Sequence, residues 1–123
     1  MPSDPAAVDL ACLAHLRRAC PPGDGPTSLG AVVGLFLDLS AERLAGMRRA
    51  LAAGDSEALR TLAHAVKGSG GLFGATRLSG LGAELEEAAG QAGLDRAGGL
   101  VALIEAEMAA VEAVLVREAG LGR

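Results

Sequence analysis

The sequence predicts an all-α fold, an antiparallel up-down four-helix bundle with an additional N-terminal helix. Three observations support this prediction. The chain has 123 residues, which is the usual size of one domain. Half of the residues are hydrophobic, and most of these are the 26 alanines and 20 leucines, which favour helices. The chain has no Trp, no Tyr, two Phe and one Ile, so a β-sheet would lack the side chains that sheets bury.

The first predicted helix runs from about Asp4 to Ala19, where Val8, Cys12 and Leu16 recur at helical spacing. It ends at the loop 20–26, which is rich in proline and glycine. We therefore expect residues 1–26 to form an N-terminal accessory helix and loop, and residues 27–119 to form the four-helix bundle, within a single domain overall.

Thr27 or Ser28 is predicted to cap the second helix, whose apolar residues recur at intervals of three and four. These residues are Leu29, Val32, Val33, Phe36, Leu37, Leu44, Met47 and Leu51. Gly54 is expected to end this helix, and Asp55 to cap the third. Glycines at positions 68, 70, 71 and 74 predict that the third helix ends by about Phe73, because each glycine weakens a helix.

The fourth helix is predicted from about Thr76 to Ala89, with leucines at positions 78, 81 and 85 on one face. After a short glycine-rich connection, Asp95 is expected to cap a fifth helix that reaches at least Leu115. Two antiparallel hairpins, one on each side of Gly74, would bury the apolar stripes as a bundle.

Charge and composition exclude several kinds of function. The net charge is −4 and the charges are dispersed, so neither a basic stripe nor an aromatic platform for nucleic acid is present. We expect Phe36 and Phe73 to lie in the core instead. The sequence contains no signal peptide and no apolar run long enough for a membrane span, which indicates a cytoplasmic protein.

Metal and acid–base sites are not expected. Cys12 and Cys20 are too few for a disulfide framework or a structural zinc site, and the pair of Cys12 and His15 lacks a third ligand. We interpret the acidic run at positions 84, 86 and 87 as a solvated helix face. Neither Ser69 nor Ser79 lies in the context of a hydrolase nucleophile.

His64 is the residue most suited to chemistry. On a helical wheel it lies opposite the apolar face of the third helix, so we expect its side chain to be exposed. Arg60 and Lys67 share its side of the helix, and Lys67 is the only lysine in the chain. Gly68 costs the helix about 1 kcal/mol relative to alanine, and it leaves space beside the imidazole. This face thus combines a nucleophile, cations that attract a phosphoryl group, and room for its approach.

The segment from Ala63 to Ala75 resembles the H-x-x-K-G-S signature of histidine-containing phosphotransfer (HPt) domains, with the signature itself at His64 to Ser69. The resemblance extends over about residues 28–117. It implies a four-helix bundle whose histidine exchanges a phosphoryl group with an aspartate of a response-regulator receiver domain, as a carrier in a two-component phosphorelay.

The resemblance also implies roles for single residues. His64 corresponds to the phosphorylated residue, with the phosphoryl group on Nε2. Lys67 would hold the phosphoryl oxygens, and Gly68 would permit close docking. Arg60 is added from the helical wheel alone, as an electrostatic helper. Gly71 departs from the pattern, because several family members have a polar side chain there, and its hydrogen bond to the histidine is therefore missing.

The phosphoryl group is expected to come from a partner, because the chain has no P-loop or other nucleotide-binding motif for autophosphorylation. The expected partners are response-regulator receiver domains and a hybrid or sensor histidine kinase. We expect no cofactor on this chain, and Mg²⁺ on the receiver domain. Ala65, Gly71 and Leu72 surround His64 and are expected to contact the partner, with the protein acting as a monomer.

Two alternatives stay open. The chain would be a non-catalytic helical interaction module if it bound a receiver or kinase domain without phosphotransfer. It would be an excised phosphotransfer domain if it belonged to a chemotaxis-type or hybrid histidine kinase. A dimerising kinase helix pair is disfavoured, because Ala65 follows the histidine where that family has an acidic residue, and no proline follows Pro26.

Overall fold

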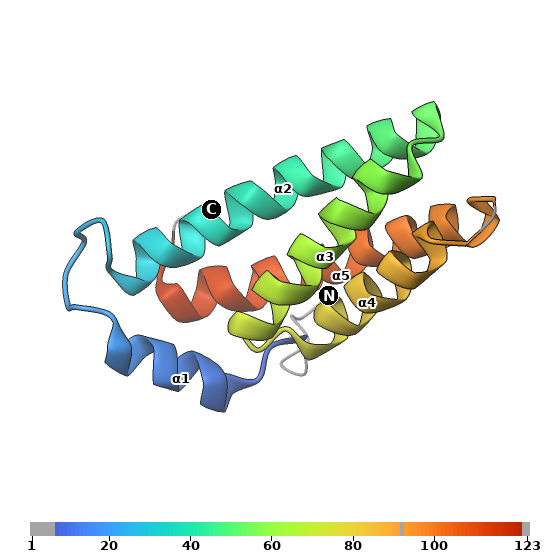
Figure 1. The fold of residues 1–123 in the computed structure, drawn as a ribbon. Helices are drawn as coiled ribbons and strands as arrows, with labels where there is room; N and C mark the ends of the chain where they lie inside the picture. Colours follow the sequence, from blue (N-terminus) through green and yellow to red (C-terminus); the bar gives the residue numbers. More distant parts are fainter. Residues whose placement is uncertain (1–6, 92, 122–123) are drawn as a thin grey trace.

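The computed structural model describes residues 7–91 and 93–121 (Figure 1). Every regular element in this part of the chain is a helix, and the predicted all-α class is confirmed. The helices are α1 (Leu10–Ala19), α2 (Leu29–Ala53), α3 (Ser56–Leu72), α4 (Thr76–Ala89) and α5 (Asp95–Ala119). None of the helices in the described residues is long and apolar enough to cross a membrane.

Helices α2 to α5 form the predicted four-helix bundle. The α2–α3 hairpin and the α4–α5 hairpin turn at the same end of the molecule, and α1 lies at the other end (Figure 1). Within the bundle, α3 packs against α2 and α4, and α5 packs against the other sides of α2 and α4. Each helix therefore has two neighbours, and one face of every helix is left for solvent or a partner.

The core consists of the apolar stripes that the helical periodicity predicts. Its largest fully buried side chains come from all five helices and from the segment before α1, and they include Val8, Leu13, Val33, Met47, Leu59, Val66, Leu78, Leu85, Ile104 and Leu115. Phe36 and Phe73 are both buried, and their rings stack with centroids 4.3 Å apart. The prediction that both aromatic residues belong to the core is confirmed.

The first helix begins later than the sequence predicts. It starts at Leu10 and not near Asp4, because Asp9 has extended backbone and caps the helix with its side chain. The backbone N–H of Asp9 donates to Gly74 O at 2.8 Å, so this residue is tied to the turn between α3 and α4. Residues 4–6 of the predicted helix lie outside the described residues.

The turn between α3 and α4 requires glycine at position 74. Gly74 has φ of 73°, in the left-handed region, and an added Cβ would lie 2.9 Å from Cys12 Cβ. A side chain here would therefore be strained and would also push α1 away from the bundle. Leu13 of α1 is almost fully buried, so α1 covers this end of the core.

The predicted helix boundaries hold elsewhere with one exception. Ser28 and Asp55 cap α2 and α3 with their side chains, and α2 ends at Gly54. Asp95 was expected to be the cap of α5, which is wrong. Leu94 is the cap residue of α5, and its carbonyl accepts a hydrogen bond from Ala97 N–H in the first turn. Asp95 is therefore already the first helical residue.

Candidate functional site

His64 lies on the solvent side of α3. Its side chain is 70% exposed, whereas Leu59, Ala63 and Val66 on the opposite side of the same helix are buried. The position of the ring follows from the helical periodicity alone, because the apolar residues that hold α3 in the bundle fix which side faces outward. The structure therefore places His64 where the helical wheel predicts.

Glu86 of α4 contacts the histidine, and the sequence interpretation missed it. Its Oε2 lies 2.9 Å from His64 Nδ1, and its Oε1 lies 3.6 Å from Lys67 Nζ. A carboxylate can only accept, so the short contact assigns the ring proton to Nδ1. The Nε2 atom then carries the free lone pair. The interpretation of the acidic run as a solvated face is wrong for Glu86, because its partners lie on a different helix.

Glu86 reaches the histidine because α4 passes unusually close to α3. An added Cβ at Gly82 would lie 2.8 Å from Lys67 N, so no larger residue fits at this crossing. Ser79 strengthens the contact, since its hydroxyl donates to Lys67 O at 2.7 Å. Gly82 and Glu86 are four positions apart and share one face of α4. Gly80 and Glu84 have the same spacing, so the sequence of α4 alone did not identify Glu86.

Gly68 has a different environment. A Cβ added there would meet nothing within 4 Å, and its φ is not in the left-handed region, so the fold itself does not require glycine. Next to it, Ser69 is structural. Its hydroxyl donates to Ala65 O at 2.9 Å and accepts from Arg43 Nη1 at 3.0 Å. The serine of the signature thus joins α2 to α3, while the glycine leaves open space beside His64.

The other predicted site residues have different environments. Arg60 lines a shallow hollow of about 230 Å³ together with Thr61, His64 and Glu86. Leu72 is 61% exposed, as is Leu35 of α2. Gly71 is exposed and Ala65 is half-buried. The hydrogen bond that was expected to be missing at Gly71 is supplied to the ring by Glu86 instead.

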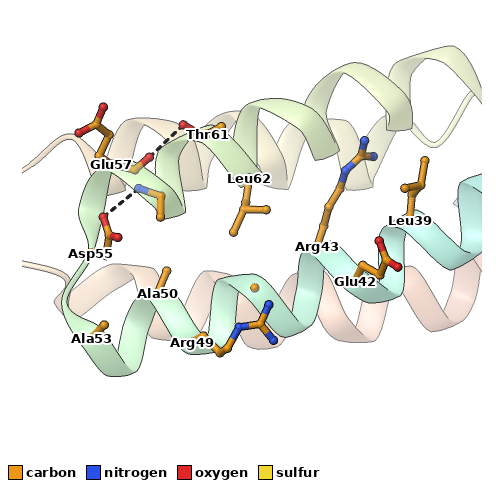
Figure 2. A pocket seen from close by; sticks show the side chains of 12 residues that line it. Leu39, Glu42, Arg43, Arg49, Ala50, Ala53, Asp55, Glu57, Thr61 and Leu62 are labelled. Atoms are coloured by element: carbon orange, nitrogen blue, oxygen red, sulfur yellow. Dashed lines mark hydrogen bonds between the residues drawn. The ribbon is translucent and has the colours of Figure 1, made fainter.

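A larger groove runs between α2 and α3 (Figure 2). It has a volume of about 890 Å³, and Thr61 lines both this groove and the hollow at His64. Leu62 projects from α3 toward α2, and Arg43 projects from α2 toward α3, so the groove has an apolar floor with charged sides (Figure 2). The groove therefore continues the surface around the histidine toward the α2–α3 turn.

No metal centre was found among residues 7–91 and 93–121. Within these ranges, no three His, Cys, Asp or Glu side chains come together as a metal site would need. Cys12 and Cys20 are both free thiols. The Sγ atom of Cys12 lies 3.5 Å from Leu72 O, which is a contact between α1 and the end of α3.

The fold and the exposed histidine together define the class of this protein, which is a helical bundle for histidine phosphotransfer. The family model described as the Hpt domain matches residues 31–114, and the chain belongs to this family. Its function is histidine phosphotransfer in a phosphorelay, and Hpt domains interact with receiver domains and histidine kinases.

Among solved structures, the chain is similar to the crystal structure of histidine-containing phosphotransfer protein B from Pseudomonas aeruginosa PAO1. The two are 34% identical, with a TM-score of 0.83 over 95% of this chain and 97% of that chain. No curated protein sequence matches the chain.

Proposed function

We propose that His64 carries the phosphoryl group on Nε2 and exchanges it reversibly with the aspartate of a response-regulator receiver domain. The observation that carries this proposal is the 2.9 Å contact between His64 Nδ1 and Glu86, which occupies one ring nitrogen and leaves the other for reaction. The 70% exposure of the side chain allows the active site of a second protein to reach Nε2.

The residues around the ring suit the charge of a phosphoryl group. Transfer between nitrogen and oxygen needs in-line positioning and neutralisation of the phosphoryl oxygens more than covalent help from the carrier. Lys67 is one helical turn from His64 and supplies the positive charge, with Arg60 as a second cation on the same side. Gly68 leaves the approach to the ring free of side-chain atoms.

The proposed docking surface extends from the histidine over Ala65, Gly71 and Leu72 and along the groove between α2 and α3. The residues on this surface are small or are exposed and apolar. They would allow a receiver domain to approach the ring closely. In the proposed exchange the receiver supplies the acceptor carboxylate and Mg²⁺, and this protein acts as a cytoplasmic monomer without a cofactor of its own.

The test is phosphotransfer to the purified protein from a panel of phosphorylated receiver domains. We expect the wild type and His15→Gln to become labelled, and His64→Gln to stay unlabelled. His15 is the matched control, because it is the only other histidine in the chain. The label should be labile in acid and stable in base, as a phosphoramidate is.

His64→Gln should also keep the thermal stability of the wild type, because the ring lies outside the core. A large loss of stability would contradict the exposed position of the ring. If receiver domains bound the protein but none labelled it across a broad panel, the non-catalytic interaction module would replace this proposal.

A further inference from the structure

We propose that the outer face of α5 binds a second copy of this chain, with the two α5 helices packed antiparallel and centred on Ala106. The proposal goes beyond phosphotransfer and does not rest on it. Helices α3 and α5 lie at diagonally opposite corners of the bundle, because each packs against both α2 and α4. The exposed side of His64 therefore points away from the second copy, and a single copy remains the unit of transfer.

An uncharged stripe of mostly small side chains follows the solvent side of α5. At about 100° per residue, its members lie within about 60° of the direction of Ala106. Leu103 is the one large side chain among them and is 54% exposed. Ala110 is half-buried, and the others are exposed. We call this set the α5 stripe, and it consists of Gly99, Ala102, Leu103, Ala106, Ala109, Ala110 and Ala113.

Carboxylates flank the α5 stripe without entering it. Glu105 pairs with Arg48 of α2, and Glu107 pairs with Arg77 of α4. These two carboxylates lie about 100° from the centre of the stripe, on opposite sides, and Glu112 lies about 120° away. A helix packed on the stripe would therefore bury apolar surface and leave these charges paired or in water.

The two ends of α5 carry opposite charges at matched positions. Asp95 and Arg117 are both exposed, each is 11 positions from Ala106, and both lie within about 20° of its direction. In an antiparallel pair centred on Ala106, Asp95 of each copy lies opposite Arg117 of the other. A parallel pair would instead place like charges together at both ends. The charges therefore select the antiparallel arrangement, which a two-fold axis generates from a single surface.

The same register matches the shapes along the stripe. Gly99 of one copy lies opposite Ala113 of the other, because both are seven positions from the centre. Leu103 of each copy packs on Ala110 of the other, where the side chain is a single methyl group. Because small residues face one another near the two-fold axis, the helices can approach closely, and the leucine fills the space between them.

A hollow beside the stripe is independent evidence that this side of the molecule receives a ligand. It has a volume of about 260 Å³ between α2 and α5, and Ala109 of the stripe lines it together with Ser40 of α2. Ser40 is only 6% exposed, and its hydroxyl makes no hydrogen bond within the described part of the chain. The oxygen is not sealed off but is open to the hollow. Hydroxyl groups of buried residues are normally bonded, so this position indicates a further polar group at this face. A second copy on the stripe covers the open side of the hollow.

The expected association is weak. One pair of helices buries less than the roughly 1,200 Å² at which standard interfaces begin, which is the range of transient complexes. We expect a dissociation constant of about 10–1,000 μM. At low micromolar concentration the protein is therefore monomeric, and pairs form when it is concentrated.

The first experiment mixes two charge variants, Asp95→Lys and Arg117→Glu, and measures association by sedimentation equilibrium at up to about 1 mM protein. Each variant alone places like charges at both ends of the pair, whereas a mixed pair has opposite charges at both ends. We expect each variant alone to associate about tenfold more weakly than the wild type, and the mixture to regain the strength of the wild type. Equal association of the variants and of their mixture would overturn the proposal, as would a wild type that stays monomeric at the highest concentration.

The second experiment locates the contact by disulfide formation. In a background without the native thiols, Cys12→Ser with Cys20→Ser, mild oxidation should link Ala106→Cys into a dimer, because the two new thiols face each other across the axis. Ala53→Cys is the matched control, since this exposed alanine of α2 lines the groove toward α3 and should stay unlinked. Equal linking of both variants would contradict the predicted contact.

The third experiment compares two exposed leucines. Leu103→Glu places a charge inside the predicted contact and should weaken association at least about tenfold. Leu35→Glu makes the same change on α2, at a position that is 61% exposed, and should associate like the wild type. Leu103→Glu should also accept the phosphoryl group from a receiver domain at the wild-type rate, because α5 lies away from His64. Equal weakening by both substitutions would overturn the proposal, whatever the outcome of labelling at His64.

Discussion

Gly68 and Gly82 both lie inside helices near His64, but glycine is suited to the two positions for opposite physical reasons. At Gly82 the fold requires the absence of a side chain, because an added Cβ would lie 2.8 Å from Lys67 N. At Gly68 a Cβ would meet nothing within 4 Å, so the helix tolerates a side chain and only an approaching partner does not. One glycine brings α4 and Glu86 to the histidine, and the other keeps the outer face clear.

This contrast gives a pair of predictions. Gly82→Ala should lower the free energy of unfolding by about 1–3 kcal/mol, because it forces two backbones apart. Gly68→Ala should raise it by up to about 1 kcal/mol through better helix propensity, and Gly68→Leu should weaken receiver binding without loss of stability. Urea denaturation and a receiver-binding titration measure these effects. A destabilised Gly68→Ala would show that the fold, and not the partner, requires this glycine.

Lys67→Ala should slow transfer between His64 and a receiver domain by about 10-fold to 100-fold, which corresponds to loss of one charge-assisted hydrogen bond. The side chain is half exposed and outside the core, so thermal stability should remain near that of the wild type. Single-turnover transfer and thermal denaturation, with Lys67→Arg as the variant that keeps the charge, measure both effects. Equal rates for all three proteins would remove Lys67 from the mechanism.

The beginnings of α3 and α5 show how similar local sequences can serve different purposes. Asp55 is a true cap, because its carboxylate accepts from Ala58 N–H at 3.0 Å. Asp95 lies one position inside its helix and makes no such bond, although its sequence context also suggested a cap. Which residue caps a helix depends on the path of the loop before that helix, and this path depends on the whole loop and not on the local sequence.

Asp55→Ala should therefore lower the free energy of unfolding by about 1 kcal/mol, because an exposed N–H of the first turn loses its partner. Asp95→Ala should cost less, since only the attraction between its charge and the helix dipole, at most about 1 kcal/mol, is removed. Urea denaturation of both variants measures the difference. A larger loss for Asp95→Ala would mean that it caps α5 in solution.

For the molecule as a whole, α1 closes the end of the bundle where α3 turns into α4. Leu13 is 1% exposed, Asp9 N–H donates to Gly74 O, and Arg17 reaches Glu118 near the end of α5 with a bond of 2.7 Å to its carbonyl. Helix α1 was predicted to be an accessory helix within the same domain as the bundle. Its contacts connect the turn between α3 and α4 with the last residues of α5, and Cys12 of α1 contacts Leu72 O.

We expect Leu13→Ala to lower the free energy of unfolding by about 2–5 kcal/mol, as removal of a buried leucine side chain does. Unfolding monitored by circular dichroism in urea should remain a single transition, because α1 and the bundle share one core. Leu10→Ala, at a half-exposed position in the same helix, is the matched control and should change stability little. A small effect at both positions would show that α1 folds independently of the bundle.

The sequence by itself determined the helical class, the order of the helices and the side of α3 on which His64 lies. These properties follow from local composition and from the spacing of the apolar residues, so they can be predicted from the sequence of each helix by itself. The prediction of Lys67 and Gly68 as site residues also uses local sequence only, because both lie within one turn of His64. The start of α1 was predicted wrongly, because it depends on the backbone hydrogen bond from Asp9 N–H to Gly74 O, and Gly74 is far away in sequence.

Only the tertiary structure decided the partner of the imidazole ring. Glu86 is 22 residues from His64 and lies in an acidic run that has no distinguishing feature on its own helix. Its role arises from the crossing of α3 and α4, where Gly82 permits the two backbones to touch and Ser79 holds them together. A contact between helices depends on their spacing and rotation, which the periodicity of either helix alone does not specify.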